Sequence, residues 1–218
     1  MANVKQQLET PSIPSLGFAP DVYERRHFSE NYGALNTYFR KTISVLGALL
    51  GPQGGKYLNT PHGAFQDSTD QTAANTTTAY AVKFNTTDFA NGVTIASDSR
   101  ITVAVDGIWN LQFSIQFKNT TNDGQDVDIW FRKNGTNIAN SNSRFFLPAR
   151  KSSGDPSHLI TAMNFFVDMV KDDYVEIMWR VSDVGVSIEH YATSTSPTRP
   201  AIPSAIATMS FVSNLPTV

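Results

Sequence analysis

The stretch that decides the fold is WNLQFSIQFK, residues 109–118, in which apolar and polar residues alternate over all ten positions. Successive side chains of a β-strand point to opposite faces of a sheet, so this pattern predicts a strand with one buried and one outward face. The aromatic residues Trp109, Phe113 and Phe117 all fall on the apolar face. We therefore expect a long, half-buried strand whose aromatic side faces a core.

Other segments show the same alternation. Val127, Ile129 and Phe131 predict the inner face of the next strand, and Asn134-Gly135 behind it favours a two-residue hairpin turn. Further strand patterns lie at 79–84, 92–95, 100–105, 175–181, 186–191 and 205–212. Many short strands with frequent turn signals predict a mainly β, antiparallel sandwich over residues 64–218.

The segments 159–170 and 205–212 carry apolar residues on both faces. Strands of this kind are buried on both faces, and the outer face of a two-layer sandwich is covered either by a loop or by another subunit. Because an exposed apolar patch is an aggregation risk, we expect oligomerisation. The outward Trp130 favours a subunit contact over a sugar-binding platform. The predicted interface residues are Ile160, Ala162, Phe166, Met209, Phe211 and Trp130.

A helical pattern precedes the strands. Residues 1–20 are polar and interrupted by prolines, which is typical of an extended arm. Asp21, with Glu24 three residues later, predicts a helix start, and Gly51-Pro52 predicts its end. The predicted helix, 21–51, carries one apolar stripe at helical spacing. The stripe consists of Phe28, Tyr32, Leu35, Phe39, Ile43, Leu46 and Leu50.

This stripe has no second predicted helix to cover it. Three partners remain open: the chain's own sandwich, sibling helices in a coiled coil, or a docking protein. The length of the stripe favours oligomerisation or docking, hence an attachment role. Residues 52–63, which contain Gln53-Gly54-Gly55, predict a linker between the helix and the sandwich.

Composition excludes several functions. The formal net charge of −2 gives no basic field to attract nucleic acid or an anionic membrane. There is no cysteine, which leaves out disulfides and thiolate chemistry. The N-terminal residues lack the apolar core of a signal peptide, and no stretch approaches the ~20 apolar residues of a membrane span. We expect no nucleic-acid binding and no membrane insertion.

Candidate sites for chemistry are weak. No nucleophile elbow or phosphate-binding loop occurs, and the histidines are dispersed, so we expect neither an enzyme nor a cofactor. Asp123, Asp126 and Asp128 lie close enough in sequence to suggest calcium, but the ligand set is incomplete and an ordinary turn is the better interpretation.

Three arginines are candidates for contact with a receptor. Arg144 and Arg150 fall in a predicted loop region, 139–157, and Arg199 falls in a second predicted loop that prolines stiffen. Binding residues often lie on such loops, although a solvated charged loop is the simpler interpretation.

The order of these features resembles the C1q/TNF-like jelly-roll superfamily. Segment 107–113 is similar to that family's Gly-hydrophobic-aromatic strand, and 130–135 is similar to its Lys-Asn-Gly hairpin. Segment 170–175 is similar to a turn of the family, with Asp172 where Gly is usual. Members form compact trimers about a three-fold axis. The resemblance implies an antiparallel jelly roll and a homotrimer.

A second resemblance spans most of the chain. The blocks 63–67, 69–73, 132–136, 183–191 and 196–201 resemble proteins of tailed phages of marine bacteria. Those proteins are regarded as virion structural or fibre-type components. The resemblance implies a virion protein, made in a bacterial cytoplasm, that contacts other virion proteins in the tail, neck or capsid.

These observations predict a trimeric fibre-type or adhesin component that the N-terminal segment anchors to the particle. Two alternatives stay open: a capsid-decoration (cement) trimer and a carbohydrate-binding module. A host surface glycan is a candidate ligand in the first and last of these roles, because three copies at one tip convert weak contacts into avidity.

Overall fold

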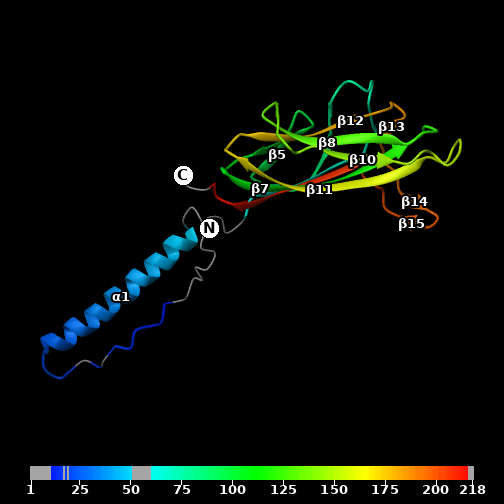
Figure 1. The fold of residues 1–218 in the computed structure, drawn as a ribbon. Helices are drawn as coiled ribbons and strands as arrows, with labels where there is room; N and C mark the ends of the chain where they lie inside the picture. The colour runs from blue at the N-terminus through cyan, green and yellow to red at the C-terminus, as the bar shows by residue number, and fades with distance from the viewer. Residues whose placement is uncertain (1–10, 17, 19, 51–59, 216–218) are drawn as a thin grey trace. The chain divides into compact units, whose positions relative to one another are not determined.

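The computed structural model describes residues 11–16, 18, 20–50 and 60–215, and it forms two compact units, one of which spans Asn59–Leu215. The other unit holds the helix, and Figure 1 shows both along the chain. The chain is 49% strand and 12% helical, with antiparallel sheets. The prediction of a mainly β sandwich with one helix before it is therefore confirmed.

Helix α1 (Arg25–Leu50) begins four residues later than predicted. The carbonyl of Glu24 accepts the first helical hydrogen bond, from the Phe28 amide at 3.2 Å, while Asp21 lies in a bend. Glu24 is thus the residue at the N-terminal boundary, and Asp21 is too far upstream to cap the helix. At ~1.5 Å per residue the helix is about 39 Å long. The predicted stop at Gly51-Pro52 and most of the predicted linker lie outside the described residues.

Two sheets and a short hairpin make up residues 60–215. Sheet A contains β1 (His62–Asp67), β2 (Gln71–Thr72), β4 (Thr86–Asn91), β7 (Gly107–Asn119), β11 (Ser157–Met169), β13 (Val186–Ile188) and β16 (Ala205–Ser213). Sheet B contains β3 (Tyr80–Ala81), β5 (Val93–Ala96), β6 (Arg100–Val103), β8 (Gln125–Lys133), β9 (Thr136–Asn137), β10 (Ser143–Leu147) and β12 (Tyr174–Val181). The separate hairpin pairs β14 (Ser194–Thr195) with β15 (Thr198–Arg199).

Strand β7, which includes the 109–118 stretch, is the central strand of sheet A. It pairs along its whole length with β11 on one side, and with β16 and then β13 on the other. The order across sheet A is therefore β11-β7-β16-β1-β4, while sheet B runs β10-β8-β12-β6-β5. Strand β1 begins at His62, so the predicted boundary at residue 64 falls inside a strand.

The core lies between the two sheets and is rich in aromatic residues. The apolar face of β7 is buried as predicted, and its Trp109 and Phe117 are at most 1% exposed. Phe113 meets Phe131 of sheet B at a centroid distance of 6.0 Å in an edge-on arrangement, which is favourable for aromatic pairs. Other large buried core residues are Phe65, Ile101, Ile129, Ile177 and Trp179.

Three backbone positions explain the turn signals in the sequence. Asn134 and Gly135 have φ of 48° and 81°, as a hairpin turn with two left-handed residues requires. Asp172 also has a positive φ, 68°, a conformation that glycine adopts most easily. A Cβ on Gly107 would lie 2.3 Å from the Phe211 ring and 2.8 Å from the Ser213 carbonyl oxygen, so glycine is required there.

Candidate interaction surfaces and a polar pocket

The outward face of sheet A exposes large apolar side chains. Ile160 and Phe166 on β11 are 61% and 57% exposed, and Ala162 between them is also exposed. Across β7, strand β16 adds Ile206 and Val212, because Ala162 and Ile206 both lie opposite Ser114 in the register. We call these five residues the apolar face of sheet A.

The two predicted interface residues on β16 do not belong to this face. Met209 is 1% exposed and lies in the core, so its assignment to a subunit contact is wrong. Phe211 is half-buried and packs edge-on against Trp109 at 5.6 Å. Side chains alternate along β16, and the face that carries Met209 is the inner one. The outward side chains are those of Ile206 and Val212.

Trp130 points outward as predicted, but it lies on sheet B, on the opposite side of the sandwich from the apolar face. Its indole nitrogen donates to Asn137 Oδ1 at 2.8 Å. Its cross-strand neighbour on the same outward face is Met178, which is 1% exposed. Because such neighbours pack side by side, Trp130 covers Met178 within its own chain.

Ion pairs cover much of the remaining outward face of sheet B. Glu176 is 3% exposed, and its carboxylate accepts from Arg132 Nε and from Ser99 Oγ, each at 2.9 Å, with Arg100 at 3.9 Å. Beside it, Asp128 accepts from Arg144 Nε at 2.8 Å and lies 3.7 Å from Arg180. The charges of this face are thus largely satisfied inside the chain.

The predicted loop position of Arg144 is wrong. Arg144 lies on β10, a strand that the polar sequence around it did not indicate. Its hydrogen bond with Asp128, strengthened by the charges of Asp128 and Asp126, raises the pKa of Arg144. Arg150 does lie in a loop, where its Nε donates to Asn122 Oδ1 at 2.8 Å. Neither guanidinium stands free as a receptor contact.

The weak calcium candidates are not arranged as a site. Asp128 and Asp126 face Arg144, with Asp126 at 4.0 Å. The Asp123 carbonyl accepts from the Asn119 side chain within an ordinary turn. Across the ranges that the structure describes, no group of three His, Cys, Asp or Glu side chains is placed to hold a metal ion.

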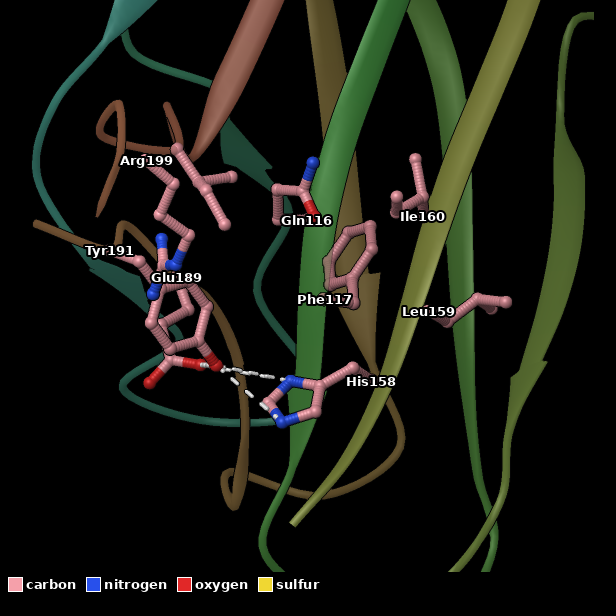
Figure 2. Close-up of a pocket in the computed structure, with 9 residues that line it drawn as sticks. Gln116, Phe117, His158, Leu159, Ile160, Glu189, Tyr191 and Arg199 are labelled. Carbon is pink, nitrogen blue, oxygen red and sulfur yellow. Dashed lines mark hydrogen bonds and ion pairs between the residues drawn. The ribbon is translucent and has the colours of Figure 1, made fainter. Parts of the chain in front are cut away.

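A pocket of about 570 Å³ opens on the outward side of sheet A (Figure 2). Strands β7 and β11 supply Gln116, His158 and Ile160 on one side. The segment after β13 supplies Glu189 and Tyr191 on the other, and Arg199 of the β14–β15 hairpin completes the wall. Arg199, one of the three predicted receptor arginines, therefore lies at a concave surface.

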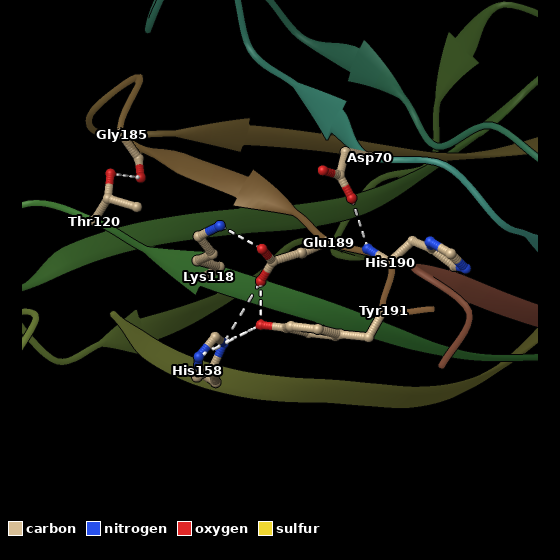
Figure 3. A network of polar contacts seen from close by, with 8 residues as sticks. All are labelled: Asp70, Lys118, Thr120, His158, Gly185, Glu189, His190 and Tyr191. Atoms are coloured by element: carbon tan, nitrogen blue, oxygen red, sulfur yellow. Dashed lines mark hydrogen bonds and ion pairs between the residues drawn. The ribbon is translucent and has the colours of Figure 1, made fainter. Parts of the chain in front are cut away.

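The polar wall of this pocket is a network around Glu189 (Figure 3). The side chain of Glu189 is 11% exposed, and its carboxylate accepts hydrogen bonds from Lys118 and from the Tyr191 hydroxyl. His158 Nδ1 lies 3.8 Å from Glu189 Oε2 and 3.2 Å from the Tyr191 hydroxyl. Burial, and then the hydrogen bond to Glu189, raise the pKa of Tyr191.

Strand pairing creates this network. Lys118 and His158 are register partners on β7 and β11, so both face outward at the same level. Ser187 of β13 pairs with Lys118, and the Glu189 amide donates to the Gln116 carbonyl, which brings Glu189 to the same face. The sequence pattern predicted no binding role for His158 or Glu189. The sequence feature that could have indicated this network is Lys118, a long cationic side chain on the outward face of a central strand.

The apolar stripe of α1 is exposed along most of its length. Phe28, Tyr32, Phe39 and Ile43 are each more than half exposed, Leu46 is 48% exposed and Leu35 is half-buried. The side chain of Leu50 lies outside the described part of the structure. The stripe itself is confirmed as one face of a helix, and its partner stays a prediction.

No protein-family model matches the chain, and no curated protein matches it. Among the helices of the described residues, none combines the length and apolar character that crossing a membrane requires.

Proposed function

We propose that the chain is a homotrimeric virion structural protein of a tailed phage. In this role a C1q/TNF-like jelly roll projects as a fibre-type or adhesin knob, and the N-terminal segment attaches it to the tail or neck. No bond is made or broken. The work of the molecule is assembly and adhesion.

The strand order supports the jelly-roll assignment. From β6 to β16 the main strands alternate between sheets in the order β6 (B), β7 (A), β8 and β10 (B), β11 (A), β12 (B) and β16 (A). Repeated crossing between two packed antiparallel sheets is expected of a jelly roll. The positive φ of Asp172 and the crowded site of Gly107 also agree with the family motifs that they resemble.

The observation that carries the proposal is the apolar face of sheet A. Four large apolar side chains there, those of Ile160, Phe166, Ile206 and Val212, are between 38% and 61% exposed in the isolated chain. These side chains lie on β11 and β16, on either side of the polar outward row of β7. Large exposed apolar side chains gathered on one face of a sheet favour an interaction site. A closed three-fold assembly buries the same patch on every copy and leaves no open end.

The exposed stripe of α1 supports a separate attachment role. A helix that exposes Phe28, Tyr32, Phe39 and Ile43 along one face needs a groove or sibling helices to cover them. In our proposal other virion proteins supply that cover. A cement role at capsid three-folds uses the same two surfaces, and a carbohydrate-binding module uses the pocket instead.

Light scattering on the full chain tests the assembly. A trimer has a mass of about 72 kDa, three times the chain mass of 24.0 kDa. A fragment that starts at Tyr57 should keep the trimeric mass if the sandwich makes the contact. A trimer that dissociates in this fragment moves the interface to the helix, and a monomer in both cases overturns the trimer.

Counting copies on purified particles tests the place on the virion. Quantitative mass spectrometry against a major capsid protein should give a small copy number for a tail or neck component. A copy number comparable with that of the capsid protein supports the cement role instead, and absence from particles overturns the virion assignment.

A further inference from the structure

The pocket beside Glu189 has the volume of a ligand site. Its volume of about 570 Å³ falls within the range of small-molecule pockets, roughly 300–1,000 Å³. The polar groups converge on it from four segments: β7, β11, the residues after β13, and the β14–β15 hairpin (Figure 2). Convergence of this kind is not needed to hold a sandwich together.

Of the cations around the pocket, Arg199 has no ion-pair partner among the described residues. Lys118 and Glu189 form an ion pair and neutralise each other. Arg199 lines the same pocket, and within the described ranges its guanidinium makes no ion pair or hydrogen bond. Asp70 is also close enough to influence Tyr191, but its carboxylate accepts the His190 amide at 2.8 Å. The group left to recognise an external anion is Arg199.

The partner that best fits a free guanidinium is a carboxylate or a phosphate, because the planar fork donates two parallel hydrogen bonds to either. The rest of the pocket favours a ligand that also carries hydroxyl groups. Glu189 has acceptor capacity beyond its two present bonds, and His158 is 49% exposed and offers a ring nitrogen. Ile202 supplies apolar surface for the carbon skeleton of such a ligand.

We propose that this pocket binds the acidic sugar residue of a polysaccharide, with Arg199 on the sugar carboxylate and Glu189 and His158 on its hydroxyls. A hexuronic acid combines the three required properties: one carboxylate, several hydroxyls and a compact apolar ring face. The inference names a ligand class for the adhesive role and rests on the proposed function for its purpose. The binding itself requires only the folded sandwich.

The test is calorimetry or saturation-transfer NMR on the full chain with methyl glucuronide, and with methyl glucoside as the matched ligand. The two probes share a ring and differ in the carboxylate. We expect the glucuronide to bind at least ~10-fold more tightly, because a charge-assisted hydrogen bond contributes a factor of about 10 to 100. Equal affinity for the two probes, or no binding of the glucuronide, overturns the proposal.

Arg199→Gln supplies the protein side of the test. Arg199 is exposed on a short hairpin, so its replacement leaves the core untouched. We expect Arg199→Gln to weaken glucuronide binding about 10-fold or more and to leave glucoside binding unchanged. Lys171→Gln removes the same charge from an exposed turn outside the pocket and should change neither affinity. A loss that is equal in the two variants reflects net charge alone and contradicts the pocket.

The mass of the same samples separates this inference from the proposed function. A trimer that does not bind the glucuronide disproves the sugar pocket and leaves the trimer standing. A monomer that binds it disproves the trimer and leaves the sugar pocket standing.

Discussion

The outward faces of the two sheets differ in which side chains they carry and in how those side chains are covered. On sheet B, Glu176 and Asp128 are buried under arginines of neighbouring strands, and Trp130 covers Met178. On sheet A, Ile160 and Phe166 stand exposed with no charged network over them. One face is covered by side chains of its own chain, while the other exposes large apolar side chains.

This difference indicates which face would gain more free energy from burial against a partner. An exposed ion pair contributes little to stability, whereas apolar area contributes about 25 cal/mol per Å² when it leaves water. A face closed by its own charges has little to gain from a second copy. A face that carries exposed Ile and Phe side chains gains most from one.

The largest expected effect comes from breaking the apolar face of sheet A. Ile160→Lys with Phe166→Lys places two charges where a partner would pack, and a desolvated, unpaired charge disfavours an interface strongly. We expect the mass in light scattering to fall from that of a trimer to that of a monomer, with an unchanged far-ultraviolet dichroism spectrum.

The matched control is Val184→Lys, because Val184 is 53% exposed in a loop outside this face. It should leave the trimer intact. If the double lysine variant also remains trimeric, the apolar face of sheet A is not the interface.

A smaller effect is expected when sheet B loses the centre of its charge network. Glu176→Ala removes the acceptor of Arg132 and Ser99 and leaves Arg100 close to Arg132. We expect the free energy of unfolding to fall by about 2–3 kcal/mol, since the hydrogen bonds to a nearly buried carboxylate are lost. Urea denaturation measures it.

Asp168→Asn is the comparison for that variant, because Asp168 is 72% exposed and its ion pair with Lys133 is 3.4 Å long. It should cost less than about 0.5 kcal/mol. Equal losses in the two variants would show that burial of Glu176 adds nothing to its network.

Trp130→Phe tests whether the indole packs within its own chain or lies in the subunit interface. If Trp130 covers Met178 within the chain, the loss of its hydrogen bond to Asn137 should lower the free energy of unfolding by about 0.5–1 kcal/mol and leave the mass of the assembly unchanged. Thermal unfolding and light scattering on one preparation measure both. Dissociation of the trimer would show that Trp130 lies in the subunit interface, as the sequence predicted.

The smallest effect is expected on the free energy of unfolding at alkaline pH, through Tyr191 in the network around Glu189. The pKa of Tyr191 is raised in the folded chain from its ordinary value of 10.0, first by burial and then by Glu189. The neutral hydroxyl is favoured, so its contribution to stability is complete below pH 10 and is lost as pH rises through the folded pKa.

The unfolding free energy of the wild-type chain should therefore decline more steeply above pH 10 than that of Tyr191→Phe. Tyr32→Phe, on the exposed stripe of α1, is the control and should follow the wild type. Parallel curves for the wild type and Tyr191→Phe would mean that Tyr191 titrates normally.

The sequence predicted the regular strands better than the irregular ones. β7, β8 and β12 carry apolar residues at every second position, and each was expected within a few residues of its observed bounds. β4 and β10 were not expected, because TTDFAN and SRFFL do not alternate cleanly. Their strand character comes from pairing with β1 and β8, which local sequence does not encode.

The candidate site was predicted less well than the fold. Arg199 was singled out for its stiff loop, but its neighbours Glu189 and His158 were not. Glu189 lies 71 residues from Lys118 in the sequence, and the ion pair depends on three strands meeting in one register. The spacing of residues along the sequence therefore does not predict such a pair.

The sequence by itself determined that the chain has a helix with one apolar stripe and a β sandwich with an aromatic core, because side-chain periodicity is a local property of helices and strands. It also determined that β11 and β16 are apolar on both sides. The tertiary structure alone decided which side of β16 faces inward, and so placed Met209 in the core and Ile206 at the surface. That choice depends on the register between strands far apart in sequence, where a shift of one residue exchanges the two faces.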